Sequence, residues 1–342
     1  MRILLIAFSL VLLPLAAFAD SAPHYHLVHS YALGGDGFWD YLSFDAATHR
    51  MFISRGTRLE VVDPEKDTLL GEIPDTEGVH GAALAPELGK GFTSNGRSDS
   101  VTVFDLKTLK TTNTIKLTGE GPDGFAYEPV TKRMFFFNGH SKNVSVVDAV
   151  SEKEIAVIPL PGRPEFAAVD GKGRVYVNIE STSQLSEIDA AKAVVTKTWS
   201  LAPCENPSGL AMDQVHRRLF SGCDNKLMAV SDPDAGKVVA TFPIGEGVDA
   251  CGFDPGTGLA FSSNGRDGTL TVAHEDSPDK YTVVQTVATR KFARTMTLDP
   301  VSHRVYLVTA DVKVDPTPVP AGQRPKRTMV PGSFTVLIMA PH

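Results

Sequence analysis

Residues 125–160 read FAYEPVTKRMFFFNGHSKNVSVVDAVSEKEIAVIPL, and this stretch decides the fold. It contains four short runs of β-branched and aromatic residues, at 125–128, 133–137, 144–148 and 154–160. Such runs, bounded by Gly, Asn, Pro and Ser, are typical of β-strands. The two middle runs are apolar on both faces, as in a sheet that is buried between two other sheets. Helical periodicity is absent, so the stretch predicts a four-stranded antiparallel unit.

The same unit recurs along the chain. Its first run ends in an acidic residue or its equivalent, and seven copies follow one another at intervals of 40–45 residues. The residues that close these first runs are Asp45, Ala85, Glu128, Asp170, Asp213, Asp254 and Asp299. Seven repeats at this period are typical of propeller blades, so we predict an all-β, seven-bladed β-propeller with four-stranded blades.

The two ends of the chain predict how the ring closes. The last copy stops after a third strand at 333–339, and a strand-like segment at 26–33 precedes the first copy. We expect the N-terminal strand to complete the last blade, because such closure leaves no exposed sheet edge.

Three strand-turn-strand pieces carry a family resemblance. They are FTSNGR at 92–97 before VTVFD at 101–105, FFNGH at 136–140 before VSVVD at 144–148, and FSSNGR at 261–266 before TLTV at 269–272. The pattern resembles the YVTN-type β-propeller repeat family, which includes YncE-like periplasmic proteins, across essentially the whole mature chain. The resemblance implies a propeller with a binding or scaffold role, although propellers as a class host unrelated activities.

The N-terminus has the features of a signal peptide, which we place at 1–19. Arg2 supplies a positive charge, an apolar run follows at 3–15, and Ala17-Phe18-Ala19 matches a cleavage site. We therefore expect cleavage after Ala19, a single mature domain at 20–342, and a periplasmic or secreted location. No later apolar run is long enough to cross a bilayer. The formal net charge of −7 argues against nucleic-acid binding, which depends on Lys and Arg.

Three cysteines allow one disulfide in an oxidising compartment. We expect Cys204 to pair with Cys223, because the start of one antiparallel strand lies beside the end of the next. Cys251, at the start of the first strand of the sixth copy, then remains a buried thiol. A bond between Cys223 and Cys251, or three free thiols, are the alternatives.

One polar residue stands five positions before the closing residue of every copy. These residues are Asp40, His80, Asp123, Glu165, Ser208, Asp249 and Arg294. Because the innermost strands of a propeller line a central channel, we expect these side chains to ring one mouth of it. Four carboxylates and a histidine suit a hard cation or an ammonium or guanidinium group, and crowded carboxylates should raise one another's pKa values. The plainer interpretation is that they cap strand ends at a wet channel mouth.

A second set of residues ends the second strand of each copy. It comprises Arg55, Asn95, Asn138, Asn178, Cys223, Asn264 and Thr309. Asn beside Gly is typical of turns, where its side chain folds onto its own backbone. We expect Arg55, Arg97, His140 and Arg266 to form a sparse basic rim over the same face, unless they are ordinary solvated side chains.

The last copy carries an insertion at 311–332 that contains five prolines. Proline disfavours helix and sheet, so we expect a stiff extended loop on the channel-mouth face. Long irregular loops are usually functional or disordered, so this one is either a lid or partner-contact loop or a disordered insertion.

Known catalytic signatures are missing from the sequence. There is no Gly-x-Ser-x-Gly elbow, His-Glu-x-x-His motif, phosphate-binding glycine loop or Cys-x-x-Cys-His haem attachment. We therefore expect an exported, non-catalytic binding or scaffold protein without a cofactor, which recognises a small ligand, a peptide or a periplasmic protein at the channel mouth. The alternatives are a metal-assisted lyase or lactonase with a divalent cation at the same mouth, and a subunit or partner of a periplasmic redox system.

Overall fold

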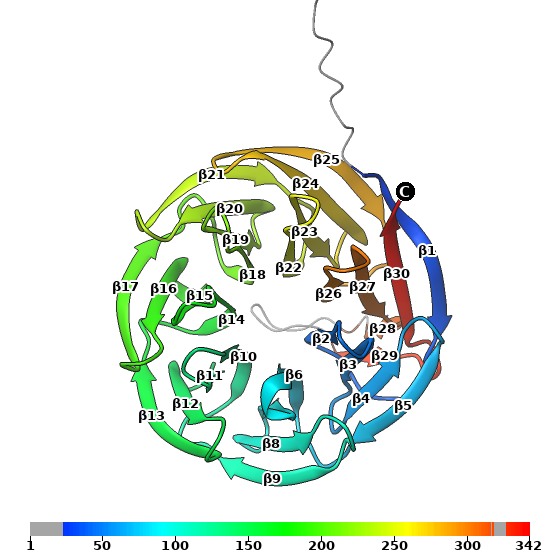
Figure 1. Cartoon of the computed structure of the whole chain (residues 1–342). Coiled ribbons are helices and arrows are strands. Elements are labelled where there is room, and N and C mark those ends of the chain that lie inside the picture. Colours follow the sequence, from blue (N-terminus) through cyan, green and yellow to red (C-terminus); the bar gives the residue numbers. More distant parts are fainter. Residues whose placement is uncertain (1–22, 316, 318–325) are drawn as a thin grey trace, which may run out of the picture.

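The computed structural model describes residues 23–315, 317 and 326–342. The predicted signal peptide at 1–19 and its cleavage position lie outside the described residues. Seven four-stranded antiparallel sheets surround a central axis, so the predicted seven-bladed β-propeller is confirmed (Figure 1). Among the described residues, no helix is both long and apolar enough to span a membrane.

Each blade is a sheet whose strands follow one another from the centre outward. Blade 1 contains β2 (Leu42–Asp45), β3 (Arg50–Ser54), β4 (Leu59–Asp63) and β5 (Thr68–Ile73). Blade 2 contains β6 (Val79–Ala85), β7 (Lys90–Asn95), β8 (Ser100–Asp105) and β9 (Thr111–Lys116), with the 3-10 helix η1 (Pro86–Leu88) after β6. Blade 3 contains β10 (Pro122–Glu128), β11 (Arg133–Asn138), β12 (Asn143–Asp148) and β13 (Lys153–Pro159). Blade 4 contains β14 (Pro164–Val169), β15 (Arg174–Ile179), β16 (Gln184–Asp189) and β17 (Val194–Ser200), with the 3-10 helix η2 (Glu180–Thr182) after β15.

The remaining blades complete the ring. Blade 5 contains β18 (Pro207–Asp213), β19 (Arg218–Cys223), β20 (Leu227–Asp232) and β21 (Lys237–Pro243). Blade 6 contains β22 (Val248–Asp254), β23 (Leu259–Asn264), β24 (Thr269–Ser277) and β25 (Lys280–Ala288). Blade 7 contains β26 (Met296–Asp299), β27 (Arg304–Thr309), β30 (Thr335–Pro341) and β1 (Tyr25–Ala32). Its strand order is β1-β30-β27-β26, so the N-terminal strand completes the last blade as predicted.

The hydrophobic core lies between neighbouring blades. β11, from the stretch quoted first, sends Met134 and Phe136 into the cluster shared with blade 2. Phe135 and Phe137 on its other face enter the cluster shared with blade 4. All four side chains are fully buried. A strand that is apolar on both faces is therefore explained by a sheet on either side of it.

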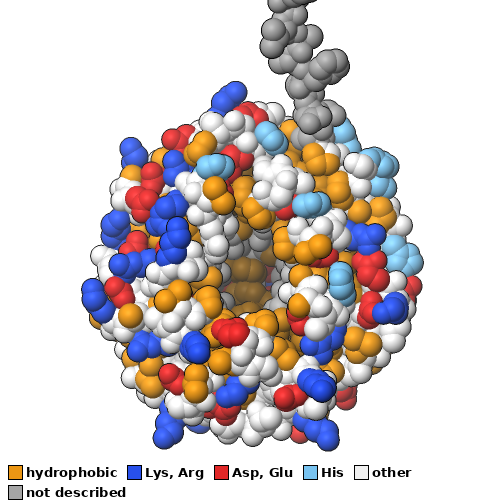
Figure 2. Space-filling view, in the orientation of Figure 1, with side chains coloured by type: hydrophobic (Ala, Val, Ile, Leu, Met, Phe, Trp, Pro, Cys, Tyr) orange, Lys and Arg blue, Asp and Glu red, His pale blue; other side chains and the backbone are white. Residues whose placement is uncertain are grey.

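The centre of the ring is hollowed in the view along its axis (Figure 2). Hydrophobic side chains surround the hollow, and most charged side chains lie further out on the blades. The innermost strands carry half-buried apolar residues such as Phe125, Met212 and Leu298, which fits this pattern.

The insertion at 311–332 leaves the ring as a two-stranded ribbon. β28 (Val312–Val314) pairs with β29 (Arg327–Met329) where the insertion leaves blade 7. The expectation that the insertion avoids sheet is therefore wrong for these two strands, which contain no proline. Residues 316 and 318–325 lie outside the described residues. Met329 packs with Trp39 and Phe334, so the ribbon starts beside the loop that carries Asp40, on the expected face.

The cysteine prediction is confirmed. Cys204 and Cys223 form a disulfide with Cα atoms 5.5 Å apart, and Cys251 is a free thiol. The bond joins the loop before β18 to the end of β19, where Pro207 stands opposite Cys223. Cys251 lies against Met228, and burial raises the pKa of its thiol to about 12. A disulfide of this kind fits a protein that folds in an oxidising compartment.

Removing the disulfide should destabilise the fold. We expect Cys204→Ala with Cys223→Ala to lower the free energy of unfolding by about 3 kcal/mol, because the bond restricts the unfolded chain. Urea unfolding measures this loss, and Cys251→Ala, which keeps the disulfide, is the control. Non-reducing peptide mapping that finds the Cys251 peptide in a linked pair would contradict the assignment.

Candidate functional site

The seven polar residues predicted at the channel mouth are brought together in the structure, and we call them the mouth ring. In blades 2–6 the pairing of the first two strands shifts register at this residue, for example between Val79 and Gly81, around His80. A β-bulge bends the strand and re-aims a side chain. The side chain of each of these residues therefore points away from the paired strands of its own blade and toward the equivalent residues of the neighbouring blades.

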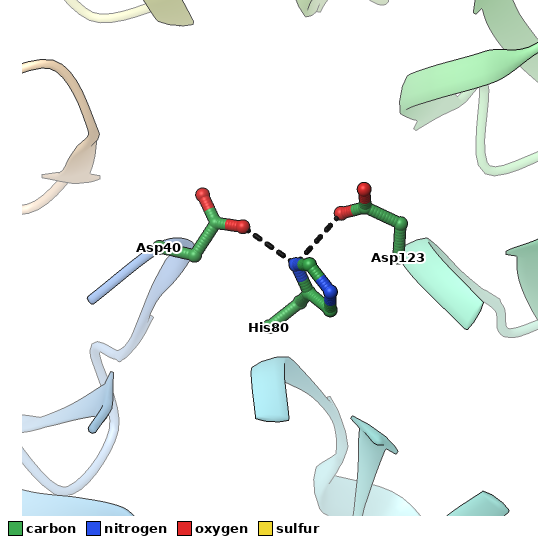
Figure 3. Close-up of side chains that lie close together, drawn as sticks. All are labelled: Asp40, His80 and Asp123. Carbon is green, nitrogen blue, oxygen red and sulfur yellow. Dashed lines mark hydrogen bonds and ion pairs between the residues drawn. The ribbon is translucent and has the colours of Figure 1, made fainter. Parts of the chain in front are cut away.

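Three mouth-ring residues form a carboxylate–imidazole–carboxylate bridge (Figure 3). His80 Nδ1 lies 2.7 Å from Asp40 Oδ2 and 3.1 Å from Asp123 Oδ1. Burial alone would lower the pKa of His80, but the two carboxylates outweigh it and raise this pKa to about 10. Burial would likewise raise the pKa of Asp40, but Arg294 and His80 hold it below its usual value. At neutral pH the bridge is therefore an imidazolium between two carboxylates.

Arg294 continues the ring of polar contacts on the other side. Its guanidinium pairs with Asp40 at 3.3 Å and also with Asp249, and it donates to the Trp39 carbonyl oxygen at 2.8 Å. Ser208 donates to the Asp249 carboxylate at 2.9 Å. Polar side chains are thus linked continuously from blade 5 through blades 6, 7, 1 and 2 to blade 3.

Glu165 of blade 4 stands apart from this chain of contacts. Arg163 donates to Glu165 Oε1 at 2.5 Å and pairs with Glu180 at 3.3 Å. Burial, together with the nearby charge of Asp123, raises the pKa of Glu165 to about 8. The expected mutual rise in carboxylate pKa values is therefore found at Glu165 but not at Asp40, which has two cations beside it.

The cations of the chain itself neutralise much of the mouth ring. His80 lies between two of its carboxylates, and Arg294 lies against Asp249 as well as Asp40. A metal ion bound to His80 Nδ1 would have to displace a proton, and a pKa of about 10 makes this unfavourable at neutral pH.

Aromatic side chains close the channel beneath the mouth ring. The Tyr41 ring of blade 1 stacks on Phe166 of blade 4 with centroids 4.1 Å apart, and lies 5.1 Å from Phe125 of blade 3. Blades 1 and 4 face each other across the axis (Figure 1), so this contact spans the channel. Glycines provide the space, because a Cβ on Gly81 would lie 2.7 Å from Tyr41 Cβ, and one on Gly124 would lie 3.2 Å from the Tyr41 hydroxyl.

Above this aromatic floor, a cavity of about 480 Å³ opens over blades 1–4. Its volume lies within the range of small-molecule sites. Its side chains combine aromatic, acidic and basic groups, and five glycines contribute backbone. The main side chains that line it are Phe38, Trp39, Asp40, His80, Arg97, Asp123, His140 and Arg163.

Two of the four predicted rim residues border this cavity. Arg97 and His140 are exposed at its edge, and Arg97 forms no ion pair with any residue that the structure describes. Arg266 is also exposed, but it pairs with Glu246 at 3.3 Å and does not line the cavity. The basic rim of the cavity therefore contains fewer residues than the sequence predicts.

Arg55 does not belong to an exposed rim, because its side chain is fully buried. Its guanidinium pairs with Glu60 at 2.8 Å and stacks 3.7 Å from the centre of the Phe334 ring. It also donates to the carbonyl oxygens of Gly34 and Asp36, at 3.0 and 2.7 Å. Arg55 thus holds the loop between β1 and β2, which carries Phe38, Trp39 and Asp40 into the cavity.

The asparagines of the second predicted set are buried, so the turn interpretation is wrong for them. Asn95 donates to the hydroxyl groups of Ser100 and Thr102 on the next strand, at 3.2 and 2.9 Å. Asn178 donates instead to the Ser208 carbonyl oxygen of the next blade at 3.0 Å. Equivalent bonds to the next strand are made by Asn138 and Asn264. A buried amide needs such partners, and the sequence hint for Asn95, Asn138 and Asn264 was the Ser or Thr seven residues after each one.

Sequence reasoning missed Arg163 and the aromatic floor. The available signal for the floor was the position directly after each mouth-ring residue, which is aromatic in Tyr41 and Phe166 and is Gly, Ala or Thr in the other blades. Arg163 stands two residues before Glu165. No other copy of the repeat has a basic residue at this position, so the repeat pattern gave no signal for it.

Comparison with solved structures shows the fold. The chain is similar to Hydrazine Synthase of Kuenenia stuttgartiensis, with 16% identity and a TM-score of 0.69 over 81% of this chain and 95% of that one. It is also similar to the WD40 repeats of RRP9, with 10% identity and a TM-score of 0.76 over 93% and 99% of the two chains. U3-55K gives 10% identity and a TM-score of 0.74 over 92% and 99%. No family profile and no curated protein matches the chain.

Proposed function

We propose that this chain is an exported, non-catalytic binding protein that holds a small ligand or a peptide, by a cationic group, in the cavity at the channel mouth. The cavity itself carries the proposal, because acidic, aromatic and basic side chains together line its volume of about 480 Å³. Propellers with WD40 repeats have the same architecture, which is compatible with a binding or scaffold role.

The charges of the cavity indicate the chemistry of the ligand. A carboxylate has about four acceptor sites, so Asp123 keeps acceptor capacity beyond its contact with His80. An ammonium or guanidinium group placed there would also favour ionisation of Glu165. Phe38 and Trp39 offer aromatic surface to the same cation, and Arg97 offers a partner for a ligand carboxylate. A zwitterion such as a basic amino acid or a peptide end therefore fits these groups best.

Neutralising the acidic side of the cavity should abolish this binding. We expect Asp123→Asn with Glu165→Gln to weaken binding of L-arginine, or of a lysine-containing dipeptide, by about 2–5 kcal/mol, the cost of losing a buried charged partner. Titration calorimetry is the measurement, circular dichroism checks the fold, and Asp224→Asn outside the cavity is the matched control. Equal affinity in the double variant would refute the proposal.

A metal-assisted lyase or lactonase at the same mouth is the competing function. It is favoured by one observation, since ligand atoms of Asp40, His80 and Asp123 all lie within 4.8 Å of one another. Elemental analysis of purified protein separates the two. Metal that disappears in Asp40→Ala or His80→Asn would favour the enzyme, and ligand binding without metal at this site would favour the binding protein.

Export is part of the proposed function. The disulfide between Cys204 and Cys223 supports it, because such bonds persist in oxidising compartments. N-terminal sequencing of the protein made in a host with a secretion pathway tests it, and the expected first residue is Asp20.

A further inference from the structure

A second cluster of polar side chains lies at the other end of the innermost strands, away from the mouth ring. Asp213 closes β18, whose first residues lie at the channel mouth, and His216 follows it in the turn to β19. Glu275 reaches the same place from β24 of blade 6. We propose that Asp213, His216 and Glu275 bind a divalent transition-metal ion such as Zn²⁺, which ties blade 5 to blade 6.

The turn of blade 5 differs from its counterparts in a way that local folding does not require. In blades 1, 3, 6 and 7 the closing acid accepts a hydrogen bond from a hydroxyl three residues later, as Asp45 does from Thr48 at 2.5 Å and Glu128 does from Thr131 at 2.6 Å. Blades 6 and 7 repeat this arrangement with Thr257 and Ser302. Blade 5 has His216 instead, with Nδ1 2.7 Å from Asp213 Oδ2. A short hydroxyl side chain is thus exchanged for a metal-ligating imidazole.

Glu275 supplies a second, independent observation that points to a ligand at this cluster. It is only 8% exposed, and among the described residues neither of its carboxylate oxygens accepts a hydrogen bond, although Oε1 forms an ion pair with His216. Oε1 lies 3.1 Å from His216 Nδ1, which is already beside the buried Asp213 carboxylate. A buried carboxylate without a donor is costly, and an ion among these ligand atoms would remove that cost.

The neighbouring strands explain how Glu275 reaches this position. β24 is nine residues long, whereas the equivalent β20 of blade 5 has six. Glu275 itself stands at the position that follows the sixth residue of such a strand, which is Leu106, Ala149 and Ala190 in blades 2, 3 and 4. Its backbone N–H donates to the Gly258 carbonyl oxygen at 2.9 Å, as the backbone N–H groups of those residues do to the turns of their own blades. Arg218, the nearby cation, does not fill the gap, because it pairs with Asp279 at 2.8 Å.

The donor set selects the kind of ion. One imidazole nitrogen and two carboxylates are ligands that Zn²⁺ accepts, with water in the fourth position. Calcium and magnesium prefer six or more oxygen ligands, which this cluster does not offer. The ligand atoms all lie within 4.8 Å of one another, and the half-exposed His216 ring leaves a path from solvent.

Zn²⁺ titration of the full mature protein tests the site. We expect one ion per chain by calorimetry and elemental analysis, and a rise in the unfolding temperature of roughly 5 °C when Zn²⁺ is present at about 100 times its Kd. His216→Thr installs the residue that other blades use, so it should fold normally. Loss of a partner that only hydrogen-bonds to a metal ligand lowers metal affinity roughly 10–100-fold. Because His216 would bind the ion directly, we expect His216→Thr to lower the affinity for Zn²⁺ by more than this.

Two control variants separate this site from other places on the chain. His303→Gln removes another histidine that lies 2.7 Å from a closing acid, Asp254, but that has no third ligand among the residues that the structure describes. This variant should bind Zn²⁺ like the unmodified protein. His80→Asn removes the imidazole of the mouth ring and should also leave binding unchanged. The proposal is overturned if the unmodified protein takes up no Zn²⁺, or if His216→Thr binds it equally well. Binding lost in His80→Asn but kept in His216→Thr would overturn it too, and would favour the enzyme at the mouth.

Discussion

A chain that lacks residues 20–33 should lose most of its stability, because β1 is the outer strand of blade 7. The deletion removes the whole antiparallel ladder between β1 and β30. It also removes Tyr25, which is 1% exposed, packs 5.0 Å from the Phe261 ring and donates from its hydroxyl to the His303 carbonyl oxygen at 2.7 Å. Truncating a buried aromatic residue alone costs about 3–5 kcal/mol. Domains are commonly stable by only about 5–15 kcal/mol, so the remaining margin should be small.

Two point variants on the same strand make this test sharper. Tyr25→Ala should lower the free energy of unfolding by about 3–5 kcal/mol. Leu27→Ala, at a position that is 46% exposed, should change it by no more than about 0.5 kcal/mol. Urea unfolding followed by circular dichroism measures all three proteins. A deletion variant that unfolds at the same urea concentration as the intact chain would show that closure by β1 does not hold the ring together.

The stability of the protein should fall as pH rises from about 5 to 10, through two groups of the mouth ring. Glu165 has its pKa raised to about 8 from a usual value of 4.5, so its contribution is complete below pH 4.5 and is lost as pH rises through 8. His80 has its pKa raised to about 10 from 6.5, so its contribution is complete below pH 6.5 and is lost as pH rises through 10. Between pH 6.5 and 8 both losses coincide, and each is at most about 1.4 kcal/mol per pH unit.

Single variants should divide this pH dependence between the two groups. Glu165→Gln should flatten the loss between pH 4.5 and 8 and make the protein more stable than the unmodified chain above pH 8. His80→Asn should flatten the loss between pH 6.5 and 10. Urea unfolding at pH 5, 7 and 9 gives the slopes, and Glu72→Gln, an exposed carboxylate on β5, is the matched control. A slope that neither variant changes would show that these groups do not titrate as described.

The blades could be predicted because their signals are local. In β11 and β12 the alternation of side chains and the intervening Asn-Gly turn lie within a few residues of one another, so the chain reveals strand, turn and strand directly. The same holds for the disulfide, because Cys204 and Cys223 belong to one blade, where antiparallel pairing places the start of one strand beside the end of the next. The pairing of β28 with β29 at the base of the insertion was not predicted, because the proline content of the whole insertion argued against sheet although these two short strands contain no proline.

The sequence by itself determined the number of blades, their strand order, the closure by β1 and the disulfide, because each follows from a repeated hydrophobic period or from neighbours within one sheet. It also placed seven polar residues at equivalent positions of the repeat. Only the tertiary structure decided what those residues touch, since His80 meets Asp40 and Asp123 from three different blades. It alone also showed that Arg55 is buried beneath the loop before β2, and that Glu275 reaches His216 across a blade boundary. These contacts join segments that are about 20–60 residues apart in the chain, and a repeat pattern does not specify which side chains of such segments bond to one another.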